Sequence, residues 1–174
     1  GATMTTSPSS RGAIATQAVV SSMYGTRGLE LLRKKVSATE VIRRLTAEDI
    51  TITADDPKIF EYYAQEKMTE EGADFIRDKK NGRIIWFTHR IRQVGVVDAQ
   101  GRSAAGTGQE CFNWAGHRSV GGFTCQGNIL AGPQVVEAMA ETFQRTAGPL
   151  PERLVAVLEA GQGQGGDSRG QQSA

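Results

Sequence analysis

The chain has 174 residues, a formal net charge of +1 and 22% charged residues, which is typical of one ordinary folded domain. A nearly neutral chain gives no electrostatic reason to expect a nucleic-acid or membrane partner. No apolar run approaches the roughly 18 residues of a membrane span, and no apolar signal-peptide core lies near the start. We therefore expect a cytoplasmic protein that binds neither nucleic acid nor membrane.

Metal and cofactor sites are not predicted. A structural zinc site needs about four closely spaced ligands, whereas the chain has two cysteines, Cys111 and Cys125, and two histidines, His89 and His117. Neither a Cys-x-x-Cys pair nor a pair of neighbouring histidines is present. The sequence predicts two reduced thiols, no metal and no cofactor.

The first third of the chain alternates polar and apolar segments. Residues 1–12 are rich in Ser, Thr, Pro and Gly, which predicts a flexible N-terminal segment. Ala13–Val20 is small, apolar and β-branched, as expected of a buried strand. A turn is predicted at Tyr24–Gly28, and helical spacing of leucines begins at Leu29 and continues to Lys35.

Two helix starts follow. Ser37 and Glu40 have the spacing of a capping box, in which the serine accepts from the amide three residues later and the glutamate accepts from the amide of the serine. Asp55-Asp56-Pro57 is a second start signal, and that helix could continue to about Lys80. Asn81-Gly82 predicts a tight turn, and Arg83–Arg92 reads as a strand.

The remainder predicts a hairpin and two helices. A strand at 93–98, a turn at 99–102 and a strand at 103–107 form the hairpin, and helices are predicted at 134–146 and 151–160. Strands and helices in this mixed order favour the α+β class, with residues 13–174 as a single domain.

The glycine-rich stretch 111–132 carries the first candidate site. We interpret it as a turn-rich rim beside a pocket, with Trp114 and His117 as a wall and His117 as an acid or base. Gln126 and Asn128 could hold a polar ligand or an oxyanion. The alternatives are a packed tryptophan, a hydrogen-bonded loop histidine, and amides that satisfy buried backbone.

A second candidate lies near the end of the chain. Asp167 and Arg169 stand in a glycine-rich loop, where Arg169 could bind an anion or a carboxylate. The alternative is an internal ion pair that orders the loop.

Seven segments together resemble a known family. They are GAIATQA (12–18), YGTRGLELL (24–32), RQVGVVDAQGR (92–102), WAGH (114–117), QGNILAGPQVVEAMAETF (126–143), LPERLVAVLEAGQ (150–162) and GGDSRGQQSA (165–174). In this order they resemble the bacterial and archaeal family called domain of unknown function 1028. The resemblance implies an N-terminal nucleophile hydrolase-like fold, an αββα sandwich, and hydrolysis of an amide bond in a small molecule or peptide.

The chain departs from the family pattern in ways that affect catalysis. Residues 50–91 stand where the family has a short loop, so they form an insertion or a replacement segment, and the family's first strands are missing. The fold implies a nucleophile at a chain start, whose α-amine acts as the base. Gly1 has no nucleophilic side chain, so Thr5 is the candidate nucleophile after cleavage.

Three interpretations of function remain open. The chain is a hydrolase that uses Thr5 and His117, a catalytically inactive binding or assembly module, or an engineered or rearranged chain on the same core. A shortened sandwich would leave strand edges and apolar faces to cover, so we expect a homo-oligomer.

Overall fold

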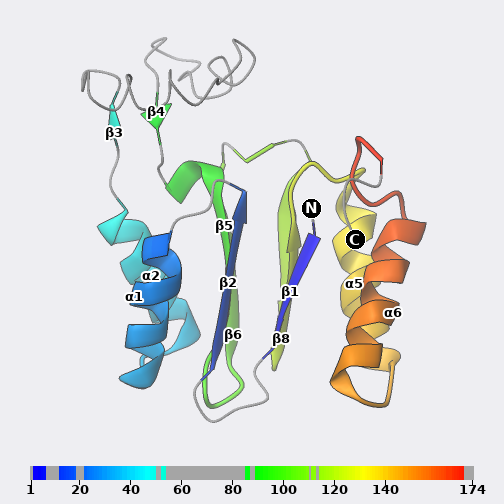
Figure 1. The fold of residues 1–174 in the computed structure, drawn as a ribbon, viewed down its shortest axis with the longest axis horizontal. Helices are drawn as coiled ribbons and strands as arrows, with labels where there is room; N and C mark the ends of the chain where they lie inside the picture. The colour runs from blue at the N-terminus through cyan, green and yellow to red at the C-terminus, as the bar shows by residue number, and fades with distance from the viewer. Residues whose placement is uncertain are drawn as a thin grey trace.

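Two antiparallel sheets pack face to face, and a pair of helices covers the outer side of each (Figure 1). The computed structural model describes residues 2–6, 12–18, 22–49, 52–53, 85–86, 89–109, 111–112 and 114–170. Because it contains both helices and antiparallel sheets, the molecule belongs to the α+β class, as the sequence predicts. Its layers follow the order helices, sheet, sheet, helices.

The first sheet has the strand order β2-β5-β6, and α1 and α2 cover it. These elements are β2 (Ala13–Ala18), α1 (Ser22–Arg33), α2 (Ala38–Glu48), β5 (Arg92–Val97) and β6 (Ser103–Thr107). The short strands β3 (Ile52–Thr53) and β4 (Ile85–Trp86) pair with each other, and the 3-10 turn η1 (His89–Ile91) leads into β5.

The second sheet has the strand order β1-β8-β7, and α5 and α6 cover it. These elements are β1 (Ala2–Thr6), β7 (Gly116–Val120), β8 (Phe123–Gly127), α5 (Pro133–Arg145) and α6 (Leu150–Gly163). Gly121 and Gly122 form the turn of the β7–β8 hairpin, and Gly122 has a positive φ of 90°. Both β6 and β7 are edge strands.

The two apolar cores lie between each sheet and its helices. Alternate residues of β5, Val94 and Val96, pack among side chains of α1 and α2, while Phe123 and Cys125 of β8 pack against α5 and α6. Successive strand residues point to opposite faces, so the intervening residues of both strands must face the other sheet.

The space between the sheets is polar. Gln93, Thr124, Gln126 and Asn128 are all buried, at 5% exposure or less, and we call them the polar inter-sheet layer. Gly95 of β5 is required there, because a Cβ at this position would overlap the amide of Gln126 and the hydroxyl of Thr124. Small and hydrogen-bonding residues thus occupy much of this space, together with the buried Val97 at the end of β5.

Several predicted boundaries differ from the structure. Ala2–Thr6 form β1, paired with β8, within the stretch predicted to be flexible. The predicted turn at Tyr24–Gly28 is helical, and Gly28 allows α1 to approach Ile14 of β2. Tertiary packing here outweighs the low helix propensity of glycine.

Two further predictions need correction. The stretch 111–132 contains the β7–β8 hairpin and is not mainly a run of turns. The continuous strand predicted over 83–92 is interrupted by η1 at His89–Ile91. The predicted helix from Asp55 to about Lys80 and the turn at Asn81-Gly82 lie outside the described residues.

The capping prediction is confirmed in part. The hydroxyl of Ser37 accepts from the amide of Glu40 at 3.4 Å. The Glu40 carboxylate instead accepts from Arg43 and Arg44 on its own helix. The predicted 93–107 hairpin and both C-terminal helices are present with boundaries close to those expected.

A buried charge pair joins the end of α2 to the start of β5. Arg92 Nε lies 3.0 Å from Asp49 Oδ2, and both side chains are at most 5% exposed. The hydroxyl of Tyr24 donates to the same carboxylate oxygen at 3.0 Å. Burial and this nearby carboxylate raise the pKa of Tyr24 well above its usual value, so the phenol stays a donor at neutral pH.

We expect Asp49→Ala to lower the free energy of unfolding by about 3 kcal/mol, because it removes the buried carboxylate that pairs with Arg92 and accepts from Tyr24. Urea unfolding followed by circular dichroism measures this. Glu30→Ala, which removes a solvent-exposed partner of Arg27 and Lys34, is the matched control and should change little. Equal losses in the two variants would contradict the assignment.

Gly95→Ala should also destabilise the protein, by roughly 1–3 kcal/mol, because its methyl group overlaps Gln126 and Thr124 across the sheets. Gly121→Ala is the control, since a Cβ there meets nothing within 4 Å. Thermal unfolding of both variants measures the difference. A Gly95→Ala protein as stable as the control would show that the sheets are packed less closely.

Candidate functional site

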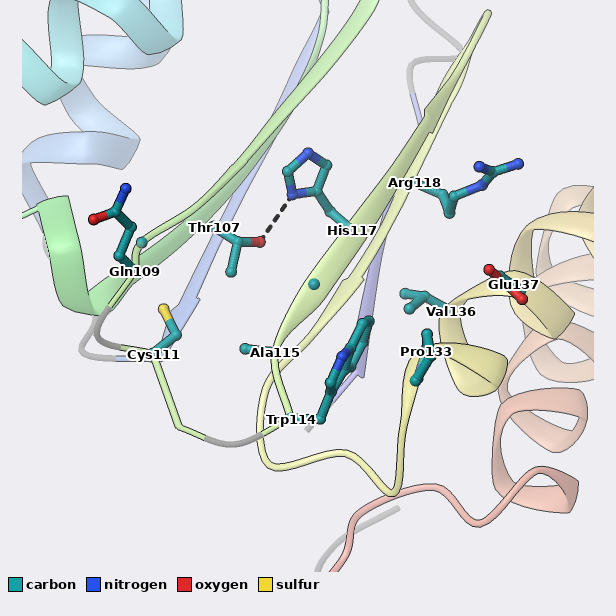
Figure 2. Close-up of a pocket in the computed structure, with 12 residues that line it drawn as sticks. Thr107, Gln109, Cys111, Trp114, Ala115, His117, Arg118, Pro133, Val136 and Glu137 are labelled. Atoms are coloured by element: carbon teal, nitrogen blue, oxygen red, sulfur yellow. Dashed lines mark hydrogen bonds between the residues drawn. The ribbon is translucent and has the colours of Figure 1, made fainter.

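A cavity of about 500 Å³ opens where the edge strands β6 and β7 approach the start of α5 (Figure 2). We call it the edge cavity. It lies within the size range of small-molecule sites. Its lining residues come from the end of β6, the loop before β7, β7 itself and the first turn of α5: Thr107, Gly108, Gln109, Cys111, Trp114, Ala115, Gly116, His117, Arg118, Pro133, Val136 and Glu137.

Strand β7 divides the edge cavity into two sides. Figure 2 shows His117 on the side of β6 and Arg118, the next residue, on the side of α5. This alternation is the ordinary pleat of a strand. The cavity therefore wraps around a sheet edge, and each side has its own chemistry.

On the β6 side, a hydroxyl meets an imidazole. Thr107 Oγ1 lies 2.9 Å from His117 Nδ1. The buried amide of Gln93 donates to the same hydroxyl oxygen at 3.0 Å, so the hydroxyl hydrogen is available for Nδ1. We assign Nδ1 as the acceptor and place the ring hydrogen on Nε2 on that basis.

The imidazole is neutral at pH 7. Partial burial lowers the pKa of His117 below its ordinary value of 6.5, because desolvation disfavours the imidazolium. A neutral imidazole with Nδ1 toward a hydroxyl can accept that proton.

On the α5 side, two opposite charges line the wall. Arg118 and Glu137 are exposed, and neither forms an ion pair with another described residue. Trp114, Pro133 and Val136 provide apolar surface beside them (Figure 2). This side combines a cation, an anion and an apolar surface.

Trp114 is held by close backbone packing. Its indole lies against Gly116, where any Cβ would overlap the ring. The backbones of Trp114 and Leu130 exchange two hydrogen bonds, of 3.3 and 3.0 Å. The predicted wall of Trp114 and His117 thus lines the edge cavity on both sides of β7.

The thiol in the edge cavity is not activated. Cys111 Sγ donates to the carbonyl of Arg92 at 3.4 Å, and burial raises the pKa of this thiol to about 11. It is therefore protonated at neutral pH, and the thiolate is the reactive form. Both Cys111 and Cys125 are free thiols, as the sequence predicts.

Gln126 and Asn128 lie in the polar inter-sheet layer and do not line the edge cavity. Asn128 Nδ2 donates to Gln93 Oε1 at 3.2 Å. Gln126 Oε1 accepts from Thr124 at 3.1 Å, while Gln126 Nε2 has no hydrogen-bond partner within the described parts of the chain. Their placement fits the alternative that these amides serve the interior.

Asp167 and Arg169 pair with each other in the loop after α6. Arg169 Nη2 lies 2.8 Å from Asp167 Oδ2, and Arg169 Nε donates to Oδ1 at 3.0 Å. These hydrogen bonds lower the pKa of Asp167 far below its usual range. The backbone of Asp167 also bridges Leu130, so the loop lies against the residues that follow β8.

Thr5 lies on a different strand from the edge cavity. It pairs with Thr124 in the register of β1 and β8, and β8 separates β1 from β7 and His117. Met4 precedes Thr5 within the strand, so the nitrogen of Thr5 is a peptide nitrogen here. Its proposed catalytic role stays a prediction.

The sequence did not single out Thr107, Arg118, Glu137 or Gln93. Gln93 and Thr107 lie in the predicted hairpin, Glu137 lies in a predicted helix, and Arg118 lies in the stretch predicted to be turn-rich. No local signal marks any of them as part of a site. The side chains of His117 and Arg118 point to opposite sides because they are consecutive residues of a strand. The sequence analysis did not predict that strand.

Metal sites and membrane-spanning helices are both absent from the described residues. The described residues contain no group of three or more His, Cys, Asp or Glu side chains placed to hold a metal ion. Among the described helices, none combines the length and apolarity needed to cross a bilayer.

Comparison with known proteins places the chain in one family. The model of a family of unknown function, DUF1028, matches residues 1–56 and 50–174. The crystal structure of a Silicibacter pomeroyi protein assigned to that family matches with a TM-score of 0.61 and 22% sequence identity, over 88% of this chain and 54% of that one. The chain thus spans about half the length of that relative, and at this identity the likeness shows the fold alone. No curated protein matches the sequence. The chain belongs to the DUF1028 family of unknown function.

Proposed function

We propose that the protein binds a small zwitterionic ligand, a free amino acid or the end of a short peptide, in the edge cavity. The observation that carries this proposal is the presence of two opposite charges, Arg118 and Glu137, on one wall without an ion-pair partner among the described residues. A guanidinium matches a carboxylate, and a carboxylate matches an ammonium group. The apolar surface of Trp114 and Val136 suits an aliphatic side chain.

The dimensions of the cavity support a small ligand. A volume of about 500 Å³ accommodates an amino acid or a short peptide. The wall mixes apolar surface with a few polar groups, which is the usual composition of such sites.

Amide-bond hydrolysis through Thr5 is the alternative implied by the family resemblance. That route requires cleavage between Met4 and Thr5, because only then would Thr5 carry a free α-amine as base. Intact-mass measurement of the purified protein distinguishes the two. A chain that begins at Thr5 would support the hydrolase, and an uncleaved chain would leave ligand binding as the function.

Self-association remains a further proposal. Val155 and Leu158 on α6 are 55% and 52% exposed, and two neighbouring apolar side chains on an outer helix are compatible with a protein contact. Size-exclusion chromatography with light scattering tests this, and a monomer at high concentration would count against it.

The binding proposal is tested by isothermal titration calorimetry with L-leucine, N-acetyl-L-leucine and L-leucinamide. Arg118→Gln and Glu137→Gln should each weaken leucine binding roughly tenfold or more, because each removes a hydrogen bond to a charged group. Arg118→Gln should hardly change leucinamide binding, and Glu137→Gln should hardly change N-acetyl-leucine binding, since those ligands already lack the matching charge.

The matched controls are Glu141→Gln and Arg145→Gln. These residues pair with each other on the exposed side of α5, with Arg145 Nη2 3.6 Å from Glu141 Oε2, and should leave leucine binding unchanged. Absence of leucine binding to the unmodified protein would overturn the proposal. So would equal effects of the cavity variants and the control variants.

A further inference from the structure

We propose that Thr107 and His117 form a nucleophile–base pair that transfers acyl groups from small carbonyl compounds, with esters as the simplest substrates. The pair lies on the β6 side of the edge cavity, away from Arg118 and Glu137 (Figure 2). Thr107, His117 and the amide of Gln93 support this proposal. It does not depend on the zwitterionic ligand proposed above.

The geometry contains three parts of a nucleophilic site. The first is a hydroxyl that lines a cavity, that of Thr107. The second is a base within hydrogen-bond reach, because His117 Nδ1 lies 2.9 Å from Oγ1. The third is an orienting group, the amide of Gln93, whose Nε2 donates to Oγ1 at 3.0 Å. A nucleophile, a base and an orienting partner in contact are the signature of an activated hydroxyl.

The hydrogen bond from buried Gln93 distinguishes the Thr107–His117 pair from an incidental contact between two surface side chains. Its side chain is fully buried, and its Oε1 accepts from Gln17 at 2.7 Å, which fixes the amide plane. The N–H that now points at the hydroxyl oxygen would form a stronger, charge-assisted bond to the alkoxide. Gln93 is therefore a positioning residue that favours loss of the hydroxyl proton.

Other groups in the cavity do not compete as nucleophile or base. Cys111 is protonated at neutral pH because burial raises the pKa of its thiol to about 11. The remaining titratable groups that line the cavity are Arg118 of β7 and Glu137 of α5, which Figure 2 places on the other side of the strand. Strand β6 contributes no titratable side chain.

The reaction balances without a further reagent. Thr107 Oγ1 attacks the carbonyl carbon while its proton passes to His117 Nδ1. The tetrahedral adduct then collapses, the bond to the leaving oxygen breaks, and that oxygen takes the proton from Nδ1. Water, deprotonated by His117, attacks the acyl ester on Thr107, releases the acid and restores the hydroxyl.

The experiment uses p-nitrophenyl acetate with the full-length protein. Release of p-nitrophenolate gives the rate, and peptide mass spectrometry after a short incubation locates the acetyl group. We expect acetyl on Thr107, and a rate reduced roughly a hundredfold in both Thr107→Val and His117→Gln. Thr107→Ser keeps the hydroxyl and should retain acetylation. Thr26→Val, an exposed threonine of α1, is the matched control and should behave as the unmodified protein.

The pH profile provides a second readout. The neutral imidazole is the base, and its pKa lies below 6.5. The rate should thus be level near pH 7 and fall as the pH decreases through the His117 pKa. Circular dichroism of each variant shows that it is folded.

Acetylation confined to lysines or Cys111, or Thr107→Val turning over the ester as fast as the Thr26→Val control, would overturn the inference. Because p-nitrophenyl acetate has neither an ammonium group nor a carboxylate, this outcome is independent of leucine binding. Failure of one proposal therefore does not contradict the other.

Discussion

The side chain of Gln93 joins the two sheets through one buried amide. It is fully buried in β5. Its Nε2 donates to the carbonyls of Gly127 and Gly116 in the second sheet, at 2.8 and 3.2 Å, and to Thr107 in its own sheet at 3.0 Å. Its Oε1 accepts from Gln17 and Asn128. A single amide thus contacts β2, β6, β7 and the end of β8, with two hydrogens shared among three oxygen atoms.

This amide explains why the interior between the sheets is polar. A buried donor or acceptor without a partner costs roughly 1–3 kcal/mol. Gln93 avoids this cost for its own amide and for the groups it contacts, whereas Gln126 Nε2 in the same layer has no partner among the described residues. Two glycines leave room for close contacts. Gly95 lies against the side chains of Gln126 and Thr124 between the sheets, and Gly116 lies against the indole of Trp114. The edge cavity lies where this network reaches the open edges of β6 and β7.

Local signals predicted much of the fold. The apolar strand at 93–98, its turn and the following strand are recognisable because the signals are short-range, and the Ser37 cap and the two C-terminal helices are equally local. The failures involve long-range packing. Gly28 lies within α1 because that helix packs on Ile14 there, and Ala2–Thr6 become a strand because β8 offers an edge to pair with.

The candidate site was predictable only in part. Trp114 and His117 lie at the edge cavity, as proposed from their aromatic and titratable character. Gln126 and Asn128 have the same chemistry as ligand-binding amides, and no sequence signal separates such a role from service in a buried network. Thr107 could not be identified, because His117 approaches it only when the two sheets stack, although Gln93 lies opposite Thr107 within the predicted hairpin.

Hydrogen exchange in Gln93→Met tests most directly whether this amide holds the second sheet against the first. Methionine is similar in size but donates no hydrogen bond. We expect the backbone amides of Gly116–Val120 in β7 to lose protection, while those of α5, which packs on the other face, keep it. Unchanged protection along β7 in a folded Gln93→Met protein would contradict the central role of Gln93.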